Sequence, residues 1–383
     1  MKKSSYIIKK VSIFIAILLI VPSVSVFADN AQTKNNTQIN SFTLDQAIDY
    51  ALKNRNDLLS NKADIMKNTT ALEEAKSAYK DLNKEKQDEK VSFTAQNYAA
   101  KSGMGVKNCE FNLFKSQEDL KLIESSIKYN VESTFYTYLC MADKVKSAKE
   151  NYDLAQQKFN NVQMKKNVGL ASNMDISSVN MTLKQAQYDL DKMTSDMENS
   201  KYDFKKAIGL DLSKDIEIKG SLALPEKPKT KIDDAIALAK QNRYESVMAE
   251  ATCKLNQDNL TSTALWYKPN TYKYQQVAYD VDASKYNYLK TQDSVEISLR
   301  KTYSDLDNAY AYLDVLDSNL DYAQKSYNTI QSKFEVGLAT STDVSDAFQK
   351  LANLKNSKSD AILNALMASR QYEYACSIGI SSN

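Results

Sequence analysis

The sequence predicts an all-α protein built from long helical hairpins that occur twice along the chain. Three observations support this prediction. The 383 residues include only 7 glycines and 4 prolines, so few positions can interrupt a helix. Apolar residues recur at alternating steps of three and four over long stretches, which is the pattern of a coiled-coil seam. The same motifs also appear in the same order in both halves, which indicates an internal duplication.

The composition excludes several classes of function. The chain contains no histidine, which removes Ser-His-Asp and Cys-His catalysis together with the usual zinc sites. Its 50 basic side chains nearly balance 48 acidic ones, so no positive surplus is available for a nucleic acid. No two carboxylates are spaced in a way that would let one act as a general acid and the other as a general base. We therefore expect no enzymatic activity, no metal and no cofactor.

Residues 1–28 have the pattern of a secretory signal peptide. A basic start is followed by an apolar run over 11–21 and by a small-residue cleavage site that ends at Ala28. The basic residues are Lys2, Lys3, Lys9 and Lys10. An uncleaved anchor is the alternative, although the run is shorter than the ~20 residues of a spanning helix. We therefore expect an exported protein, without a lipid anchor at the cut because no cysteine follows it.

The cysteines are widely separated along the chain, at Cys109, Cys140, Cys253 and Cys376. In an exported protein such residues can form disulfides. The alternative is that each is a small buried apolar residue inside a helix. The spacing alone leaves both possibilities open.

Glycine and proline divide the rest of the chain into helical arms. The arms extend over 43–100, 106–168, 172–208, 231–266, 276–336 and 340–378. An arm of about 60 residues at ~1.5 Å per residue would be about 90 Å long. The arms must therefore pair along their sides.

Each arm of the two hairpins carries one apolar row. The first outgoing row is Tyr138, Met141, Val145, Ala148, Tyr152, Ala155, Phe159 and Val162. The second outgoing row is Leu306, Ala309, Leu313, Leu316, Leu320, Ala323, Tyr327 and Ile330. The returning rows begin at Ile176 and Val344, and Lys358 interrupts the last one. We assign all four rows to the core.

Short motifs repeat in the same order in both halves. Segment 44–55 recurs as 232–243, segment 168–172 as 336–340, and segment 208–210 as 378–380. We therefore divide the mature chain into a first repeat over 42–210, a linker over 211–230 and a second repeat over 231–380. A short strand is expected at 216–224 within the linker.

Each repeat contains a Val-Gly-Leu turn with a clear local chemistry. The turns consist of Val168, Gly169 and Leu170 and of Val336, Gly337 and Leu338. Glycine tolerates the left-handed conformation that ends a helix. Ser172 and Thr340 lie three residues before Asp175 and Asp343, which is the spacing of a capping box. Each turn is therefore predicted to end one long helix and to begin the returning one.

Together these motifs resemble the TolC-like outer membrane efflux protein family. The resemblance rests on the duplicated Ala-Ile helix starts, on the Val-Gly-Leu turns followed by Asp-Ile or Asp-Val, and on the Ile-Gly helix ends, and it covers about 42–380. It implies a homotrimer whose hairpins curve into a hollow α-barrel, a tunnel for efflux from the cell envelope. It also implies two partners, an inner-membrane pump of ABC type or similar and a hairpin adaptor of the membrane-fusion type.

The resemblance also implies roles for individual residues. Both Val-Gly-Leu turns would contact the adaptor. Asp343 and Asp346, just after the second turn, would form an acidic ring that narrows the tunnel entrance. In the first repeat only Asp175 matches this pair, because Ser178 occupies the place of the second aspartate.

The chain departs from the family at the far ends of its hairpins. Family members insert two β-strands per repeat there, and a membrane-crossing strand needs ~9–11 residues. In the second repeat, 266–275 leaves room only for a turn. In the first repeat, 91–100 and 106–114 could form a short strand hairpin, but three chains would then supply only about six strands, fewer than the ~8 of the smallest barrels. We expect membrane strands that are short or absent.

Three questions stay open at the level of sequence. The protein is either an efflux component or a non-conducting extracytoplasmic coiled-coil scaffold or surface protein. It is outer-membrane-associated if the resemblance extends to location, and extracytoplasmic in the cell wall if no outer membrane exists. Trp266, Tyr267 and Tyr272 at the far turn either contact a surface, as aromatic side chains often do, or simply pack the turn.

Overall fold

The computed structural model describes residues 41–84, 94–228 and 230–381. All of them belong to one unit, Asn40–Asn383. The predicted signal peptide lies outside the described residues. Helices make up most of the described chain, which confirms the all-α fold class.

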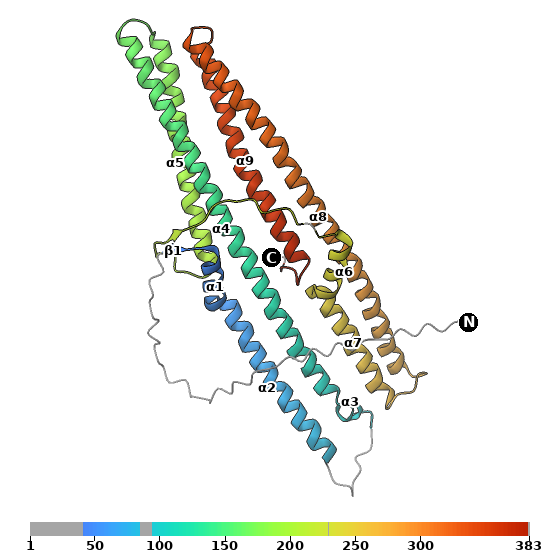
Figure 1. Cartoon of the computed structure of the whole chain (residues 1–383). Helices are drawn as coiled ribbons and strands as arrows, with labels where there is room; N and C mark the ends of the chain where they lie inside the picture. The colour runs from blue at the N-terminus through green and yellow to red at the C-terminus, as the bar shows by residue number, and fades with distance from the viewer. Residues whose placement is uncertain (1–40, 85–93, 229, 382–383) are drawn as a thin grey trace, which may run out of the picture. The chain divides into compact units, whose positions relative to one another are not determined.

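The first repeat contains two shorter helices followed by a long helical hairpin (Figure 1). Its helices are α1 Leu44–Asn54, α2 Asn56–Lys84, α3 Tyr98–Lys101, α4 Met104–Asn167 and α5 Asn173–Ile208. Helix α1 begins with a reciprocal capping box between Thr43 and Gln46. Helix α5 ends at Gly209, whose φ of 73° lies in the left-handed region that glycine favours.

The second repeat has matching helices in the same order. They are α6 Ile232–Asn242, α7 Tyr244–Ala264, α8 Tyr272–Glu335 and α9 Ser341–Ala375. Helices α1 and α6 both have 11 residues, α4 and α8 both have 64, and α5 and α9 have 36 and 35. The two Val-Gly-Leu turns therefore occupy equivalent positions, between α4 and α5 and between α8 and α9.

Two predicted arms are interrupted where the sequence shows neither glycine nor proline. The arm over 43–100 breaks at Arg55 and the arm over 231–266 breaks at Arg243, and both residues have an extended backbone. The prediction of unbroken arms is therefore wrong at these positions. The second arm also ends earlier than expected, at Ala264, and α8 begins earlier, at Tyr272.

The reason for the breaks is a joint formed by two of the repeated motifs. Arg55 Nη1 donates a hydrogen bond to the carbonyl of Ala207 at the end of α5 (3.1 Å), while its other nitrogens bind Asp57. A cation at a helix C-terminus satisfies carbonyls that have no partner within the helix. In the second repeat, the N–H of Tyr244 donates to the carbonyl of Ile378 (3.0 Å). The ends of the repeated segments 44–55 and 232–243 thus meet the Ile-Gly helix ends in space, and the chain turns at each of these joints.

The strand hairpin that the sequence left possible in the first repeat does not form over the described residues. Residues 98–101 form α3, and 106–114 lie inside α4, whereas 91–93 are outside the described residues. Gly103, with φ 79°, directly precedes α4, and Gly105 lies in its first turn with open space around it. The two glycines therefore mark the start of a helix rather than the turn of a strand hairpin.

The linker contributes one very short strand. Strands β1 Ser41–Phe42 and β2 Glu217–Ile218 pair in parallel. The expected strand over 216–224 is thus correct in place but too long, since β1 offers only two residues for pairing. Further along the linker, Tyr310 Oη donates to the carbonyl of Pro225 (2.8 Å), which fastens the segment to α8.

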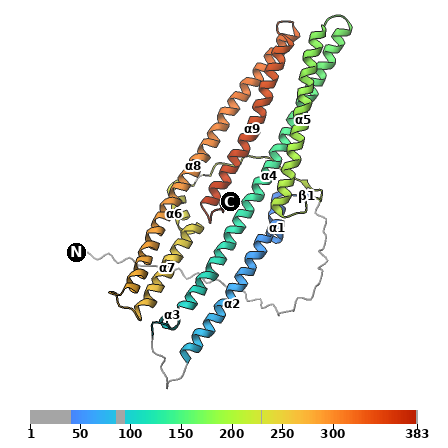
Figure 2. The same ribbon diagram turned by 180° about the vertical axis from the view of Figure 1, so that it is seen from behind.

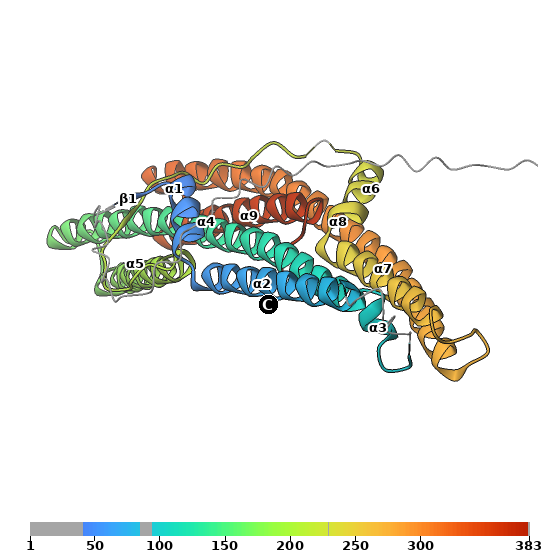
Figure 3. The same cartoon turned by 90° about the horizontal axis from the view of Figure 1, so that it is seen from below.

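The long helices pack side by side in the order α5, α4, α9, α8 (Figures 1 and 2). Helix α2 lies along α4, and α7 lies along α8. Helix α4 also contacts α7 and α9, so this helix joins the two repeats. Figure 3 shows the same arrangement from below, with the helices of the two repeats next to one another.

The apolar rows face the interior of the hairpins, as predicted, but the larger core is built from other residues. Every residue assigned to the four rows is buried or half-buried. The larger core lies where α1, α4 and α5 meet and includes Phe42, Ala47, Ala51, Leu58, Ile127, Val131, Phe135, Leu139, Phe204, Ala207, Ile208, Ile216 and Ile218. Lys358, which interrupts the last row, instead forms an ion pair with Asp317 on the facing helix (2.5 Å).

The four cysteines carry no disulfide in the structure. Cys140 is buried, and burial raises the pKa of its thiol to about 11. The other three are half-buried within or at the end of helices. None of the described helices has an apolar stretch long enough to cross a membrane.

Candidate functional site at the hairpin tips

The two Val-Gly-Leu turns form exposed tips at one end of the long hairpins (Figure 1). The exposed fraction is 69% for Val168, 77% for Leu170, 71% for Val336 and 77% for Leu338. Gly169 and Gly337 adopt φ values of 77° and 79°, which only glycine accepts at little cost. Each tip therefore presents two large apolar side chains to its surroundings.

The backbone closes each turn without help from these side chains. The N–H of Leu170 donates to the carbonyl of Lys165 (2.8 Å), and that of Gly169 to Lys166 (2.9 Å). The second turn repeats the pattern, with the N–H of Leu338 bound to the carbonyl of Lys333 (2.8 Å). These bonds belong to the glycine-type end of a helix. The leucine side chains are thus available for another role.

The residues after each turn form a complete capping box. The hydroxyl of Ser172 accepts a hydrogen bond from the N–H of Asp175 (3.1 Å), while the Asp175 carboxylate accepts one from the N–H of Ser172 (2.8 Å). Thr340 and Asp343 repeat this geometry at 3.2 and 2.8 Å. The hydrogen bonds lower the pKa of the Asp175 and Asp343 carboxyls below their usual value.

The two acidic residues after the second tip have different surroundings. The Asp343 carboxylate is occupied by the cap, because it also accepts a hydrogen bond from Thr340 Oγ1 (2.7 Å). Asp346 is exposed one turn further along α9 and lines a hollow that also includes Lys158 of α4. The equivalent place in the first repeat is occupied by Ser178, which lines a cavity instead.

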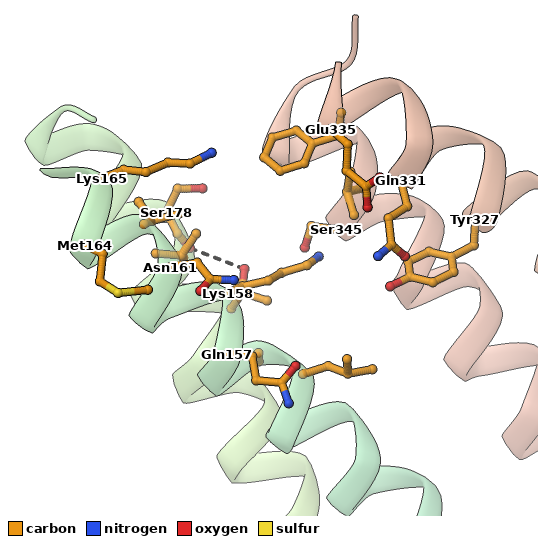
Figure 4. Close-up of a pocket in the computed structure, with 17 residues that line it drawn as sticks. Gln157, Lys158, Asn161, Met164, Lys165, Ser178, Tyr327, Gln331, Glu335 and Ser345 are labelled. Atoms are coloured by element: carbon orange, nitrogen blue, oxygen red, sulfur yellow. Dashed lines mark hydrogen bonds between the residues drawn. The ribbon is translucent and has the colours of Figure 1, made fainter. Parts of the chain in front are cut away.

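This cavity of about 430 Å³ separates the two hairpins close to their tips. Helices α4 and α5 form one wall and α8 and α9 the other, and Figure 4 shows Lys158 extending from the first hairpin toward the second. Lys158 is half-buried, and burial lowers the pKa of its amine. The cavity thus has a mixed lining, in which apolar side chains such as Val162 and Phe334 alternate with polar ones such as Asn161 and Gln331.

The two hairpins are in contact at this level through lysines and aromatic rings. Lys158 Nζ lies 5.6 Å from the ring centroid of Phe348, and Lys165 Nζ lies 5.3 Å from that of Phe334. Both distances are typical of cation–π interactions. The Phe348 ring also packs against Tyr327, with centroids 5.7 Å apart.

The sequence did not single out these lysines and phenylalanines. Lys158 and Lys165 come from α4, whereas Phe334 and Phe348 come from α8 and α9. No common spacing links residues of separate helices, so no sequence pattern indicates the contact. Among the described residues, no group of three or more His, Cys, Asp or Glu side chains is placed to hold a metal ion.

Comparisons with known proteins agree with this geometry. A family model described as outer membrane efflux protein matches residues 270–372, within the second repeat. The chain is similar in structure to the CmeC outer membrane channel of Campylobacter jejuni, with a TM-score of 0.70 and 12% identity over 89% of this chain and 87% of that chain. No curated protein sequence matches the chain.

Two further solved structures show the same likeness. The outer membrane protein VceC of Vibrio cholerae has a TM-score of 0.69 and 10% identity, over 88% of this chain and 97% of that chain. The MtrE outer membrane channel of Neisseria gonorrhoeae has a TM-score of 0.59 and 12% identity, over 88% and 89%. The chain therefore has the fold of these channels, with duplicated long helical hairpins. The match to the outer membrane efflux protein model lies within the second of the two hairpins and the segment before it.

Proposed function

We propose that this chain is an exported, TolC-like efflux component that forms a helical tunnel. It would act as a homotrimer, together with a hairpin adaptor of the membrane-fusion type and an inner-membrane pump, ABC-type or similar. The observation that carries the proposal is the pair of equivalent hairpins whose tips expose Leu170 and Leu338. A soluble monomer has little reason to expose four large apolar side chains at the ends of its longest helices.

The Val-Gly-Leu tips are the proposed docking surface for the adaptor. Three chains would present six such tips, which differ little in sequence or backbone conformation. A contact between hairpin ends buries little area, so each contact should be weak and the assembly should depend on many of them. Location follows from the same proposal: the protein lies in the cell envelope, associated with the outer membrane or, without one, outside the cytoplasm at the cell wall.

The docking role is tested with the double variant Leu170→Asp/Leu338→Asp, expressed in the native host in place of the wild-type chain. We expect the variant to stay helical and trimeric, because the turns are closed by backbone bonds, but to lose adaptor crosslinking and export. The matched control is Leu59→Asp/Leu238→Asp, which charges two leucines that are 52% and 49% exposed on α2 and α6. Normal export by the tip variant overturns the docking role, and unfolding of the tip variant would mean that the leucines are part of the core.

The acidic ring is a separate part of the proposal. If three chains meet at an axis near the second tip, Asp343 and Asp346 would attract cations there. The variant Asp343→Asn/Asp346→Asn should therefore reduce export of a cationic dye more than that of a neutral one. Asp175→Asn is the control, since it alters the equivalent cap in the first repeat. An equal effect of both variants on both dyes would assign Asp343 to capping alone, and a solid bundle in electron micrographs would favour a non-conducting scaffold.

A further inference from the structure

The turn between α7 and α8 lies at the end of α8 opposite the Val-Gly-Leu tip. Its backbone groups are bonded within the turn: the N–H of Tyr267 donates to the carbonyl of Thr263 (2.9 Å), and the N–H of Thr271 to that of Lys268 (3.0 Å). Thr271 also caps α8, because its hydroxyl accepts a hydrogen bond from the N–H of Tyr274 (3.4 Å). The turn therefore has a defined shape and presents the same side chains outward.

The base of this turn is fastened to the first repeat. The Tyr267 ring meets the Tyr98 ring edge-on, with centroids 5.4 Å apart. Nearby, Lys107 Nζ lies 2.8 Å from the carboxylate of Asp258. Tyr267 is thus the aromatic residue that packs the turn against the first repeat. Trp266 and Tyr272 are not needed for this contact.

Three large side chains with apolar surface are exposed on the turn. Their exposed fractions are 52% for Leu265, 45% for Trp266 and 87% for Tyr272. Trp266 is the only tryptophan of the chain. An amphipathic ring at such a position suits a boundary between an apolar and an aqueous phase.

The charged side chains of the turn are all positive. No acidic residue occurs between Asp258 and Asp280, and this stretch contains the exposed Lys268 and Lys273. Neither lysine forms an ion pair with any described residue. The turn therefore combines aromatic side chains with positive charges that long, flexible stems can carry outward.

We propose that this turn, 265–273, is a membrane-surface contact whose partner is an anionic lipid bilayer. Leu265, Trp266 and Tyr272 enter the headgroup region, while Lys268 and Lys273 meet lipid phosphates. A protein partner fits less well, because three apolar side chains on one convex turn bury far less than the ~1,200 Å² of a stable protein interface. A bilayer accepts such a small contact, and several copies of the chain would add their contacts together.

The test uses Trp266 as its own reporter. The purified exported chain is mixed with vesicles of phosphatidylcholine alone or of phosphatidylcholine with phosphatidylglycerol, and tryptophan emission is recorded. We expect a blue shift, quenching by brominated acyl chains and co-sedimentation with the anionic vesicles only, all reduced by added salt. The assay contains no adaptor or pump, so its result is independent of the proposed efflux function.

Two variants separate the contributions of the turn. Lys268→Gln/Lys273→Gln should weaken binding to anionic vesicles about thirtyfold at low ionic strength, from about 1 kcal/mol per lysine. The control Lys192→Gln/Lys350→Gln removes the same charge from exposed positions of α5 and α9 and should bind normally. Trp266→Ser/Tyr272→Ser should keep its helical circular dichroism and no longer sediment with vesicles.

Three results would overturn the proposal. The first is unchanged Trp266 emission with anionic vesicles. The second is an equal loss of binding in the lysine variant and its control, which would mean a diffuse attraction to the whole chain. The third is a blue shift that depends on protein concentration without vesicles, which would assign the turn to contact with a second copy of this chain.

Discussion

The seam inside each hairpin and the seam between the two repeats are built from different side chains. Within the second hairpin, α8 and α9 meet through buried apolar residues such as Leu313, Leu316 and Ala365. Between the repeats, α4 and α9 are linked mainly by ion pairs, beside the Lys158–Phe348 contact and an edge-on pair of rings from Tyr129 and Tyr374. The ion pairs are Lys144–Asp360 (2.6 Å), Glu150–Lys355 (3.8 Å) and Glu132–Arg370 (3.9 Å).

This difference indicates that one kind of seam stabilises each repeat and that the other determines how the two repeats are oriented. Burial of apolar side chains stabilises a fold in proportion to the area removed from water. Ion pairs at or near the surface contribute little to stability, but they depend on the geometry of their partners. We therefore infer that the hairpin seams hold each repeat folded, whereas the seam between α4 and α9 mainly fixes how the repeats lie against each other.

The largest effect should come from a substitution in the apolar core of a hairpin. Phe204 of α5 is completely buried, and its ring lies 5.9 Å from that of Phe135 on α4 and 6.3 Å from that of Phe42. Phe204→Ala should lower the free energy of unfolding by about 3–5 kcal/mol, measured by denaturant titration. Tyr202→Ala removes an aromatic ring that is 48% exposed on the same helix and should change it by less than about 0.5 kcal/mol. Equal losses in the two variants would contradict the assignment of this seam.

An intermediate loss in the free energy of unfolding is expected when the most buried ion pair between the repeats is broken. Glu132 has a side chain only 10% exposed, and Arg370 is its cationic partner across the seam. Arg370→Leu should destabilise the protein by about 1–3 kcal/mol at neutral pH, because it leaves the carboxylate buried without this partner. Adding Glu132→Gln in the same background should restore most of the loss. A double variant no more stable than Arg370→Leu would show that packing of the arginine stem, not charge, matters here.

The pair Glu132–Arg370 also predicts that the free energy of unfolding depends on pH. Burial raises the pKa of the Glu132 carboxyl above its usual 4.5, although Arg370 opposes the shift. The native state therefore binds this proton more tightly than the unfolded chain, and its stabilising contribution is complete below pH 4.5 and lost as pH rises through the raised pKa. Unfolding titrations across this window should show the wild type losing stability relative to Glu132→Gln as pH increases. A difference that stays constant with pH would argue against a carboxyl that titrates in the seam.

The smallest effect should come from the more exposed ion pair between the repeats. A double-mutant cycle of Lys144→Ala and Asp360→Ala should give a coupling energy of about 0.5–1 kcal/mol, since the lysine is 12% exposed but the aspartate is 50% exposed. Lys325–Asp321, a pair within α8 with side chains 75% and 63% exposed, serves as the control and should give about 0.3–0.5 kcal/mol. A coupling at Lys144–Asp360 as large as the loss in Phe204→Ala would remove the distinction between the two seams.

The features determined by the sequence itself are those that depend on neighbours along the chain. The apolar rows follow the repeat of the helix, and the turn at Gly169 with its cap at Ser172 follows from the local chemistry of glycine and serine. The same is true of the second tip at Gly337 and Thr340. Fold class, hairpin tips and capping residues of the candidate site were therefore all predictable without a structure.

Only the tertiary structure decided the features that depend on residues far apart. Helix α1 ends at Arg55 because its guanidinium reaches the carbonyl of Ala207, 152 positions later, and no local breaker marks the place. The cavity beside the tips likewise exists because Lys158 of one hairpin and Phe334 of the other line the same space. A periodic pattern states which face of a helix is buried, but it does not state which helix covers it. That choice is made by the fit of all the helices at once.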